Sequence, residues 1–293
     1  MPSSMIPIDA STRIVGVIGD PIRHSRSPAM HNAAFRALGL PYAYVAFRVA
    51  AREVGAAVRA VRALDLAGLN VTIPHKQAVI AHLDALAPAA AACGAVNTIV
   101  HRDGRLIGDN TDAAGLARDL ATLGVSPRSR LDVVIVIGAG GAARAAVFAL
   151  GRVARRIVVA ARRPAKARAL VDAMRRRVAA KLEACALDVI VPPVPRPGSL
   201  LCQARLIINA TPLGMEGEPF VPLDYAATPA DCLFYDLVYT ARRTPFLAGA
   251  ARERRPVSAG LGMLLHQGAA AFELWTGRKP PIEVMRRALV RGR

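Results

Sequence analysis

The stretch that most constrains the fold of this 293-residue chain is residues 131–150, LDVVIVIGAGGAARAAVFAL. Residues 133–137 are apolar and mostly β-branched, which is typical of a strand buried on both faces of a parallel sheet. Glycines follow at 138, 140 and 141, and residues 142–150 are almost all good helix formers. A glycine motif between a strand and a helix predicts a dinucleotide site.

Each position of this turn suits the pyrophosphate of a dinucleotide. Gly138 permits the tight turn, and Gly140 lets a pyrophosphate approach the backbone. Ala143 holds the third position of the motif, where Gly or Ala allows the helix to pack closely on the strand. The N–H groups at the helix start are available to phosphates. Tight packing of an ordinary strand–helix turn is the alternative, and the flanking elements favour the nucleotide.

The segment after the next strand, predicted at 156–160, indicates which dinucleotide is bound. An NAD site usually has Asp or Glu there for the ribose 2′-hydroxyl. Residues 161–166 instead read ARRPAK, with the cations Arg162, Arg163 and Lys166 and no acid. Arginine suits a phosphate because its planar fork offers several donors. We therefore expect NADP rather than NAD. A solvated basic helix start is the alternative, although cations at a helix N-terminus oppose the macrodipole.

The composition is compatible with an enzyme that binds anions. The length favours two domains, and 53% of the residues are hydrophobic, which excludes disorder. The net charge of +18, from 39 Lys and Arg against 21 Asp and Glu, raises the possibility of nucleic-acid binding. The arginines are spread along the chain, however, and 4% aromatic residues leave few platforms for bases. A dinucleotide and a carboxylate substrate are anions that such a charge also attracts.

Cysteine usage and the N-terminus predict a cytoplasmic protein without a metal. The four cysteines, at 93, 185, 202 and 232, form no CxxC pair and have no metal-ligand spacing. The N-terminal MPSSMIPIDASTR lacks the apolar core of a signal peptide. We also expect no membrane partner, because no apolar run is long and uncharged enough to cross a bilayer.

Polar residues follow two of the strands expected in the first half. Ser25 and Ser27 lie after the strand predicted at 13–18, and Ser27 is expected to cap a helix that starts at Pro28. The two serines are either caps or hydroxyls for a polar ligand. Lys76 follows the strand predicted at 69–73. Because α/β sheets bind ligands at strand carboxyl ends, this position raises Lys76 above an ordinary surface lysine.

Two further polar positions are ambiguous in the sequence. Thr111 or Asp112 is expected to cap a helix at 113–123, unless one of them serves the reaction. Gln267 lies among apolar neighbours in a helix predicted at 260–275, so it must hydrogen-bond either the core or a ligand. Other strands are expected at 42–47, 206–208, 233–239 and 257–259, other helices at 53–63, 88–92, 166–180 and 282–290, and a proline-rich loop at 191–199.

Eight motifs, in order and over nearly the whole chain, resemble those of the shikimate dehydrogenase family. They are GDPIRHSRSPAMHNAAF (19–35), GLNVTIPHK (68–76), GAVNT (94–98), GDNTDAAG (108–115), GAGGAARA (138–145), INATPLGM (208–215), YDLVYTARRTPFL (235–247) and GLGMLLHQGAAAFELWTG (260–277). Each motif alone is weak, but eight in order are highly specific. The resemblance implies NADPH-dependent, reversible reduction of 3-dehydroshikimate to shikimate by a cytoplasmic monomer or homodimer.

The resemblance also implies an α/β fold of two domains with a cleft between them. A substrate domain would comprise 1–111 and 261–293, and a Rossmann-type NADP domain 112–260. Lys76 and Asp112 would be the catalytic pair. The groups that bind the substrate would be Ser25, Ser27, Thr72, Asn97, Tyr239 and Gln267. The cofactor would contact Gly138, Ala139, Gly140, Gly141, Ala142, Arg162, Arg163, Lys166, Thr211, Gly260 and Met263.

The chemistry of these residues fits that reaction. Hydride transfer to a ring ketone leaves charge on its oxygen, which a nearby cation stabilises and a proton must neutralise. Lys76 can do both, and a nearby Asp112 would stabilise the ammonium charge and fix its direction. Hydroxyl and amide groups suit a substrate rich in hydroxyls with one carboxylate.

Three alternatives differ from this expectation in testable features. The quinate/shikimate branch of the family tends to use NAD, and it predicts an acid near residue 162 and replaced serines at 25 and 27, neither of which occurs. A non-catalytic nucleotide sensor predicts loss of Lys76 or Asp112. A nucleic-acid binder predicts salt-sensitive DNA binding. One departure from the family is Ala161, where an Asn that would contact the adenosine ribose often stands.

Overall fold

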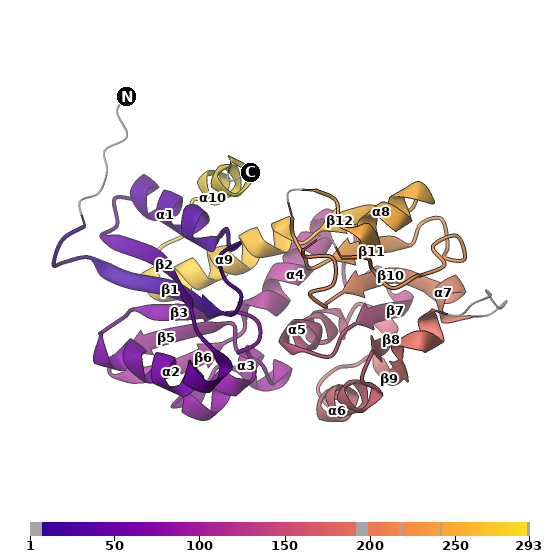
Figure 1. Cartoon of the computed structure of the whole chain (residues 1–293), viewed down its shortest axis with the longest axis horizontal. Helices are drawn as coiled ribbons and strands as arrows, with labels where there is room; N and C mark the ends of the chain where they lie inside the picture. Colours follow the sequence, from indigo (N-terminus) through magenta and orange to yellow (C-terminus); the bar gives the residue numbers. More distant parts are fainter. Residues whose placement is uncertain (1–7, 192–198, 217, 241, 292–293) are drawn as a thin grey trace. The chain divides into compact units, whose positions relative to one another are not determined.

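The computed structural model describes residues 8–191, 199–216, 218–240 and 242–291. The chain forms two compact units, Met1–Gly115 with Leu264–Arg293, and Leu116–Met263. Each unit contains one six-stranded sheet with helices around it (Figure 1). The predicted α/β class with two sheets is confirmed.

The sheet of the first unit is mixed. Its strands are β1 (Arg13–Gly19), β2 (Tyr42–Arg48), β3 (Gly68–Val71), β4 (Ala85–Leu86), β5 (Thr98–Arg102) and β6 (Arg105–Asp109), in the order β2-β1-β3-β5-β6-β4. β1 pairs in parallel with β2 and β3, whereas β5 is antiparallel to β3 and β6. The carboxyl ends of β1, β3 and β6 and the amino end of β5 therefore share one edge. The segments that carry Ser25, Lys76, Asn97 and Asp112 all lie next to this edge.

The helices of the first unit are α1 (Ser27–Ala37), α2 (Val54–Ala63), α3 (Pro88–Cys93) and α10 (Ile282–Arg291). α1 and α10 pack side by side (Figure 1). Two more helices, α4 (Thr111–Thr122) and α9 (Leu261–Thr276), belong partly to each unit, because the division between the units falls inside both.

The residues that cap α1 and α4 differ from the prediction. Ser27 is the first helical residue rather than the cap, and its backbone N–H donates to the Ser25 hydroxyl at 3.3 Å. At α4, the side chain of Asn110 accepts from the N–H of Ala113 at 3.2 Å, the pattern of an N-cap. Asp112 is therefore not the cap of α4, and its carboxylate is available for other partners.

The sheet of the second unit is parallel throughout. Its strands are β7 (Leu131–Ile137), β8 (Ala154–Ala161), β9 (Lys181–Ala186), β10 (Ala204–Asn209), β11 (Leu233–Asp236) and β12 (Val257–Ala259), in the order β12-β11-β10-β7-β8-β9. The chain thus winds outward from β7 to β9 and then from β10 to β12. This reversal makes the gap between the ends of β7 and β10 the switch point where such sheets bind ligands.

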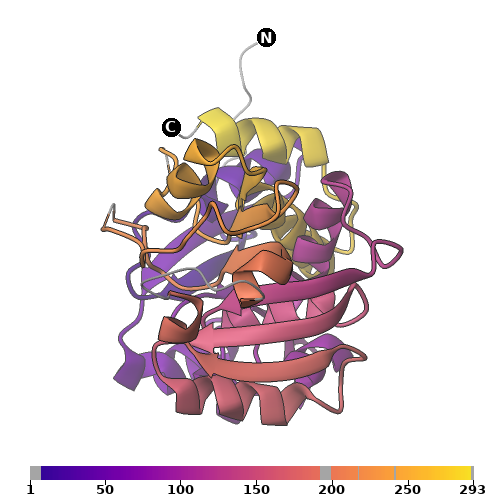
Figure 2. The ribbon, with the colours of Figure 1, turned by 90° about the vertical axis from the view of Figure 1, so that its right-hand side faces the viewer.

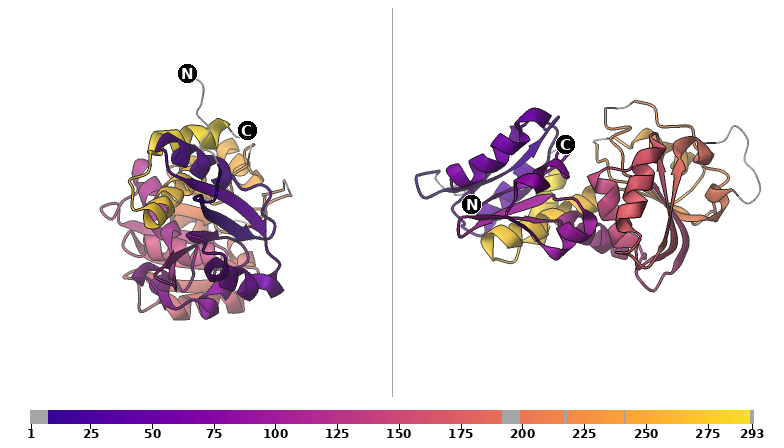
Figure 3. Two further views of the ribbon diagram at one scale, coloured as in Figure 1. Left: turned by 90° about the vertical axis from the view of Figure 1, so that its left-hand side faces the viewer. Right: turned by 90° about the horizontal axis from the view of Figure 1, so that it is seen from below.

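Helices cover both faces of this second sheet, as Figure 3 (right) shows. They are α5 (Gly141–Leu150), α6 (Pro164–Met174), α7 (Leu200–Gln203) and α8 (Pro245–Arg252). In Figure 2, α6 lies along the outer strand β9, against which it packs. Val134 and Val136 of β7 contribute to the core under α5 and α6, whereas Ile135 and its alternate neighbours contribute to the core under α8. The predicted burial of this strand on both faces is confirmed.

Three segments of the second unit differ from the expected elements. The helix after Lys166 ends at Met174 rather than near 180, and the unpredicted edge strand β9 follows it. The strand expected at 233–239 ends at Asp236, because its carboxylate accepts the N–H of Val238 at 3.0 Å and the chain turns. The proline-rich loop expected at 191–199 lies mostly outside the described residues.

A buried histidine in the first unit makes stability depend on pH. His31 of α1 is 0% exposed and stacks on Tyr44, with ring centroids 4.5 Å apart. Among the residues that the structure describes, neither ring nitrogen of His31 has a hydrogen-bond partner. Burial therefore lowers the pKa of His31 to about 3 from its usual 6.5.

We expect the His31→Phe variant to lose less stability in acid than the wild type. Between pH 6.5 and 3 the unfolded chain binds a proton at His31 that the folded chain excludes, so stability falls as the pH falls. The slope is about 1.4 kcal/mol per pH unit. Urea unfolding at pH 6.5 and pH 5 should show an acid loss about 2 kcal/mol larger in the wild type. An equal loss in both proteins would show that His31 takes up its proton without unfolding.

Candidate active site

Lys76 and Asp112 form a largely buried ion pair at the shared edge of the first sheet. Lys76 follows β3, and Asp112 lies in the first turn of α4. The Lys76 Nζ is 2.5 Å from the Asp112 Oδ2, and the two side chains are 14% and 6% exposed. The carboxylate fixes the direction of the ammonium group, which keeps a small exposed area through which a substrate oxygen can reach it.

Asn97 holds the carboxylate of this pair from its other side. Its Nδ2 lies 2.9 Å from the Asp112 Oδ1 and 2.9 Å from the Thr111 Oγ1. Its Oδ1 accepts the backbone N–H of Thr111 at 2.7 Å. Both oxygens of Asp112 are therefore engaged, one by Lys76 and one by Asn97. The start of β5 and the start of α4 are joined by the same side chain.

Gln267 of α9 belongs to the same buried cluster. Its Oε1 accepts from the Asn97 Nδ2 at 3.2 Å, and its Nε2 donates to the carbonyl of Leu264 at 2.9 Å. α9 comes close to α4 here, since a Cβ on Gly115 would lie 2.8 Å from the backbone nitrogen of Gln267. Glycine at position 115 thus lets the side-chain amide of Gln267 reach that of Asn97.

The other predicted substrate residues lie at the same edge or in the second unit. Thr72 follows β3, and its N–H donates to the carbonyl of Ile18 at 2.9 Å, which places it beside the loop with Ser25 and Ser27. Ser25 is half-buried and Ser27 is buried. Among the described residues, no hydrogen bond joins these three to the ion pair. Tyr239 follows β11 in the second unit and is half-buried.

The glycine turn lies at the switch point of the second sheet. Gly138 follows β7 with φ +118, and a Cβ there would lie 2.9 Å from the carbonyl of Ala210, which follows β10. Gly140 is the N-cap of α5 without a side-chain cap, and a Cβ there would meet nothing within 4 Å. Ala139, Gly141 and Ala142 complete the turn. The free helix start and the open space at Gly140 fit the pyrophosphate of a dinucleotide.

The three predicted phosphate-binding cations are exposed and lie together in sequence after β8. Arg162 and Arg163 precede α6, and Lys166 lies in its first turn. In the part of the chain that the structure describes, no acidic side chain forms an ion pair with any of them. Their donors therefore remain available to a ribose 2′-phosphate.

A buried network that the sequence did not indicate holds Thr211 beside the glycine turn. The Oδ1 of Asn209 accepts from the Thr211 hydroxyl at 2.6 Å, and its Nδ2 donates to Asp236 at 2.9 Å. Asp236 also accepts from the Thr244 hydroxyl at 2.6 Å. Burial raises the pKa of Asp236 to about 6, and these hydrogen bonds oppose that rise. The network ties the ends of β10 and β11 to the start of α8.

Gly260 and Met263 lie at the start of α9, in the second unit. A Cβ on Gly260 would lie 2.9 Å from the carbonyls of both Asp236 and Leu237, so only glycine fits without a shift. Met263 is 7% exposed and packs in the core under α5 and α6. The segment is therefore held against the carboxyl end of β11.

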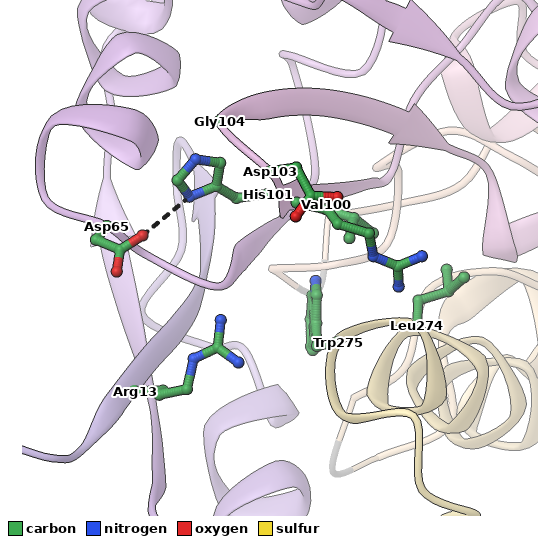
Figure 4. Close-up of a pocket in the computed structure, with 9 residues that line it drawn as sticks. Arg13, Asp65, Val100, His101, Asp103, Gly104, Leu274 and Trp275 are labelled. Atoms are coloured by element: carbon green, nitrogen blue, oxygen red, sulfur yellow. Dashed lines mark ion pairs between the residues drawn. The ribbon is translucent and has the colours of Figure 1, made fainter.

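A separate pocket of about 400 Å³ contains none of the predicted site residues. Its lining comes from the start of β1, the β5–β6 hairpin, Asp65 and the end of α9, as Figure 4 shows. His101 Nδ1 and Asp65 Oδ1 are 3.4 Å apart there. Arg13 begins β1, so this pocket lies at the edge of the sheet opposite to Lys76.

The described residues offer neither a metal cluster nor a membrane span. No group of three or more His, Cys, Asp or Glu side chains among them is arranged to hold a metal ion. No helix in the described part of the chain is long and apolar enough to cross a membrane.

Comparison with known proteins identifies the family. Residues 17–99 match the model of the shikimate dehydrogenase substrate binding domain, and 260–290 match that of the shikimate 5'-dehydrogenase C-terminal domain. The chain is 44% identical to the shikimate dehydrogenase (NADP(+)) of Citrifermentans bemidjiense, over 96% of both chains.

Solved structures agree with this comparison. The shikimate 5-dehydrogenase of Thermus thermophilus, in complex with NADP(H) and shikimate, is 36% identical, with a TM-score of 0.81 over 96% of this chain and 100% of that one. The quinate dehydrogenase of Corynebacterium glutamicum, in complex with NAD, is 30% identical, with a TM-score of 0.83 over 96% and 99%. The resemblance found in the sequence is thus confirmed: the chain belongs to the shikimate dehydrogenase family.

Proposed function

We propose that this chain catalyses the reversible, NADPH-dependent reduction of 3-dehydroshikimate to shikimate, a step in the synthesis of chorismate and the aromatic amino acids. The observation that carries the proposal is the buried Lys76–Asp112 pair at the ligand-binding edge of the first sheet. The second unit supplies a glycine turn at a switch point and three cations for an NADP phosphate. Full-length relatives at 44% and 45% identity are shikimate dehydrogenases (NADP(+)).

In this proposal Lys76 is the acid and Asp112 its positioning partner. NADPH, when bound, supplies a hydride to the ketone carbon. The Lys76 ammonium stabilises the charge that develops on the ketone oxygen and donates the proton that completes the alcohol. Asp112 holds the ammonium at 2.5 Å, and Asn97 holds Asp112 at 2.9 Å. In the reverse direction, the neutral amine form of Lys76, which the forward step leaves, accepts the proton from the shikimate hydroxyl and becomes the ammonium again.

The remaining predicted residues divide between substrate and cofactor. We assign Ser25, Ser27, Thr72, Asn97, Gln267 and Tyr239 to the hydroxyls and carboxylate of the substrate. Residues Gly138, Ala139, Gly140, Gly141, Ala142, Arg162, Arg163, Lys166, Thr211, Gly260 and Met263 are assigned to NADP. The first unit is thus the substrate domain and the second the cofactor domain. All four cysteines are free thiols, which supports a reducing, cytoplasmic location.

A quinate/shikimate dehydrogenase that uses NAD is the second candidate. The similarity to the quinate dehydrogenase of Corynebacterium glutamicum, whose complex contains NAD, favours it. Against it, an acid that would bind a ribose 2′-hydroxyl is absent from residues 161–166, and both serines of the 25–27 loop are present.

A steady-state assay of nicotinamide absorbance decides between the two. Shikimate and quinate are each paired with NADP and with NAD, and turnover is compared across the four combinations. We expect fast turnover only in the combination of shikimate with NADP. A preference for quinate or NAD would favour the second candidate, and no turnover in a folded chain that binds NADP would refute both.

A further inference from the structure

Asp119 and Tyr235 form a buried polar pair in the second unit that the proposed reaction does not use. Asp119 is on α4 and is 8% exposed, and Tyr235 is on β11 and is fully buried. The Tyr235 hydroxyl donates to the Asp119 Oδ2 at 2.5 Å. A buried carboxylate is costly unless its partners are in place, so this pair calls for a structural role.

The first turn of α9 lies against the pair. Met263, the third residue of the helix that starts at Leu261, belongs to the same buried core as Tyr235. N–H groups in a first turn have no acceptor inside their own helix. A Cβ on Gly262 would collide with the Asp119 carboxylate, so the carboxylate lies directly against this turn. Its negative charge is favourable at a helix N-terminus.

The Asp119 carboxylate therefore caps the start of α9, and Tyr235 holds that carboxylate in place. The Tyr235 hydroxyl donates to Asp119, and Gly262 lets the carboxylate approach the first turn of the helix. Burial and the adjacent Asp119 charge raise the pKa of Tyr235, so its hydroxyl keeps the proton that it donates. The cap secures the segment that ends at Met263, and Gly260 of that segment packs closely against the carbonyls of Asp236 and Leu237.

We propose that Asp119 and Tyr235 are positioning residues that hold the first turn of α9, and with it Gly260 and Met263, in the geometry that binds NADP. The inference rests on the proposed function, because it takes these two residues as part of the cofactor site. Neither Asp119 nor Tyr235 needs to touch the cofactor. Losing the cap would act on NADP affinity through the backbone of the turn.

The test is calorimetric titration of NADP⁺ into purified variants of the full chain. Tyr235→Phe removes the hydroxyl and keeps the ring, and Asp119→Ala removes the acceptor. We expect each to raise the Kd for NADP⁺ about tenfold. Asp119→Asn keeps an oxygen acceptor and should stay within about twofold of the wild type. Tyr225→Phe is the matched control in the same unit and should leave the Kd unchanged.

Gly262→Ala tests the same cap without removing any group. Alanine has a higher helix propensity than glycine, so the substitution does not by itself weaken the helix. If Asp119 and Tyr235 served only the stability of the fold, the Kd for NADP⁺ would stay unchanged. The added methyl displaces the Asp119 carboxylate, so we expect the Kd for NADP⁺ to rise in this variant too. Gly262→Ala therefore remains an independent test if Tyr235→Phe does not fold. The KM for shikimate should change by less than about twofold in every variant that folds.

Unchanged NADP⁺ affinity in Gly262→Ala, or in a folded Tyr235→Phe, would overturn the inference. That failure is distinct from failure of the proposed function. A wild type that binds NADP⁺ but does not oxidise shikimate would refute the function, whereas normal wild-type activity with indifferent cap variants would refute only the cap.

Discussion

Replacing Lys76 by alanine is expected to lower kcat for shikimate oxidation by about 10²–10⁴-fold, the usual contribution of a positioned acid–base group. The KM for shikimate should change far less, because the hydroxyl and amide groups around Lys76 still hold the substrate. The variant loses both the cation that stabilises charge on the reacting oxygen and the group that exchanges its proton. Asp112 cannot take over, because a carboxylate does not supply the missing positive charge and its Oδ1 is still bound to Asn97.

Lys181→Ala is the matched control for this variant. Lys181 also forms an ion pair, with Glu183 at 2.8 Å, but its side chain is 74% exposed on β9. We expect wild-type kinetics from it, because an exposed pair contributes little. An unchanged kcat in Lys76→Ala, measured in a variant with a wild-type melting curve, would remove Lys76 from the mechanism.

Replacing both Arg162 and Arg163 by alanine is expected to lower kcat/KM for NADP by about 10²–10³-fold. A hydrogen bond to a charged group contributes about 1.5–3 kcal/mol, and the two exposed guanidinium groups are free to form several with a 2′-phosphate. NAD lacks that phosphate, so kcat/KM for NAD should stay close to the wild-type value. The ratio of the two cofactors isolates the phosphate contact from any general damage.

Arg168→Ala, on the exposed side of α6, controls for the loss of positive charge near this site. It should leave the cofactor ratio unchanged, apart from a small salt-dependent effect. Equal losses for NADP and NAD in the double variant would show that the arginines support the fold rather than the phosphate.

The sequence was sufficient to predict the parts of the fold that depend on local patterns. Residues 133–137 are continuously apolar because both faces of β7 are covered, and a short run of that kind before a glycine turn is typical of a central parallel strand. Gly138 marks the turn for a steric reason that holds in any chain, because its φ is +118 and a Cβ there would lie 2.9 Å from the carbonyl of Ala210. The edge strand β9 escaped prediction because its residues are mostly half-buried and carry little apolar pattern.

The residues of the candidate site were predicted from the family motifs, not from local patterns in the sequence. No periodicity relates Asn97 to Gln267, which are 170 residues apart and meet because Gly115 lets α9 approach α4. The sequence equally allowed Thr111 or Asp112 to cap α4. That choice was settled by Asn110, whose side chain reaches the Ala113 N–H first.

The supporting networks could not be predicted from the sequence. Asp119 is one polar residue on a helix, and Tyr235 is one residue in a buried strand, so neither has an unusual local setting. Their significance depends on a third partner, the first turn of α9 at Gly262, which no side-chain pattern reveals. The Asn209–Asp236–Thr244 network is similar, since its members come from three separate elements that no local pattern connects.

A crystal structure of the wild-type chain with shikimate and NADP⁺ would test the central claim most directly. The account predicts that the ring hydroxyl to be oxidised lies about 3 Å from the Lys76 Nζ. It also predicts that the Lys76–Asp112 contact persists in the complex. Shikimate bound with that hydroxyl away from Lys76, for example in the pocket lined by Arg13 and Trp275, would contradict the account.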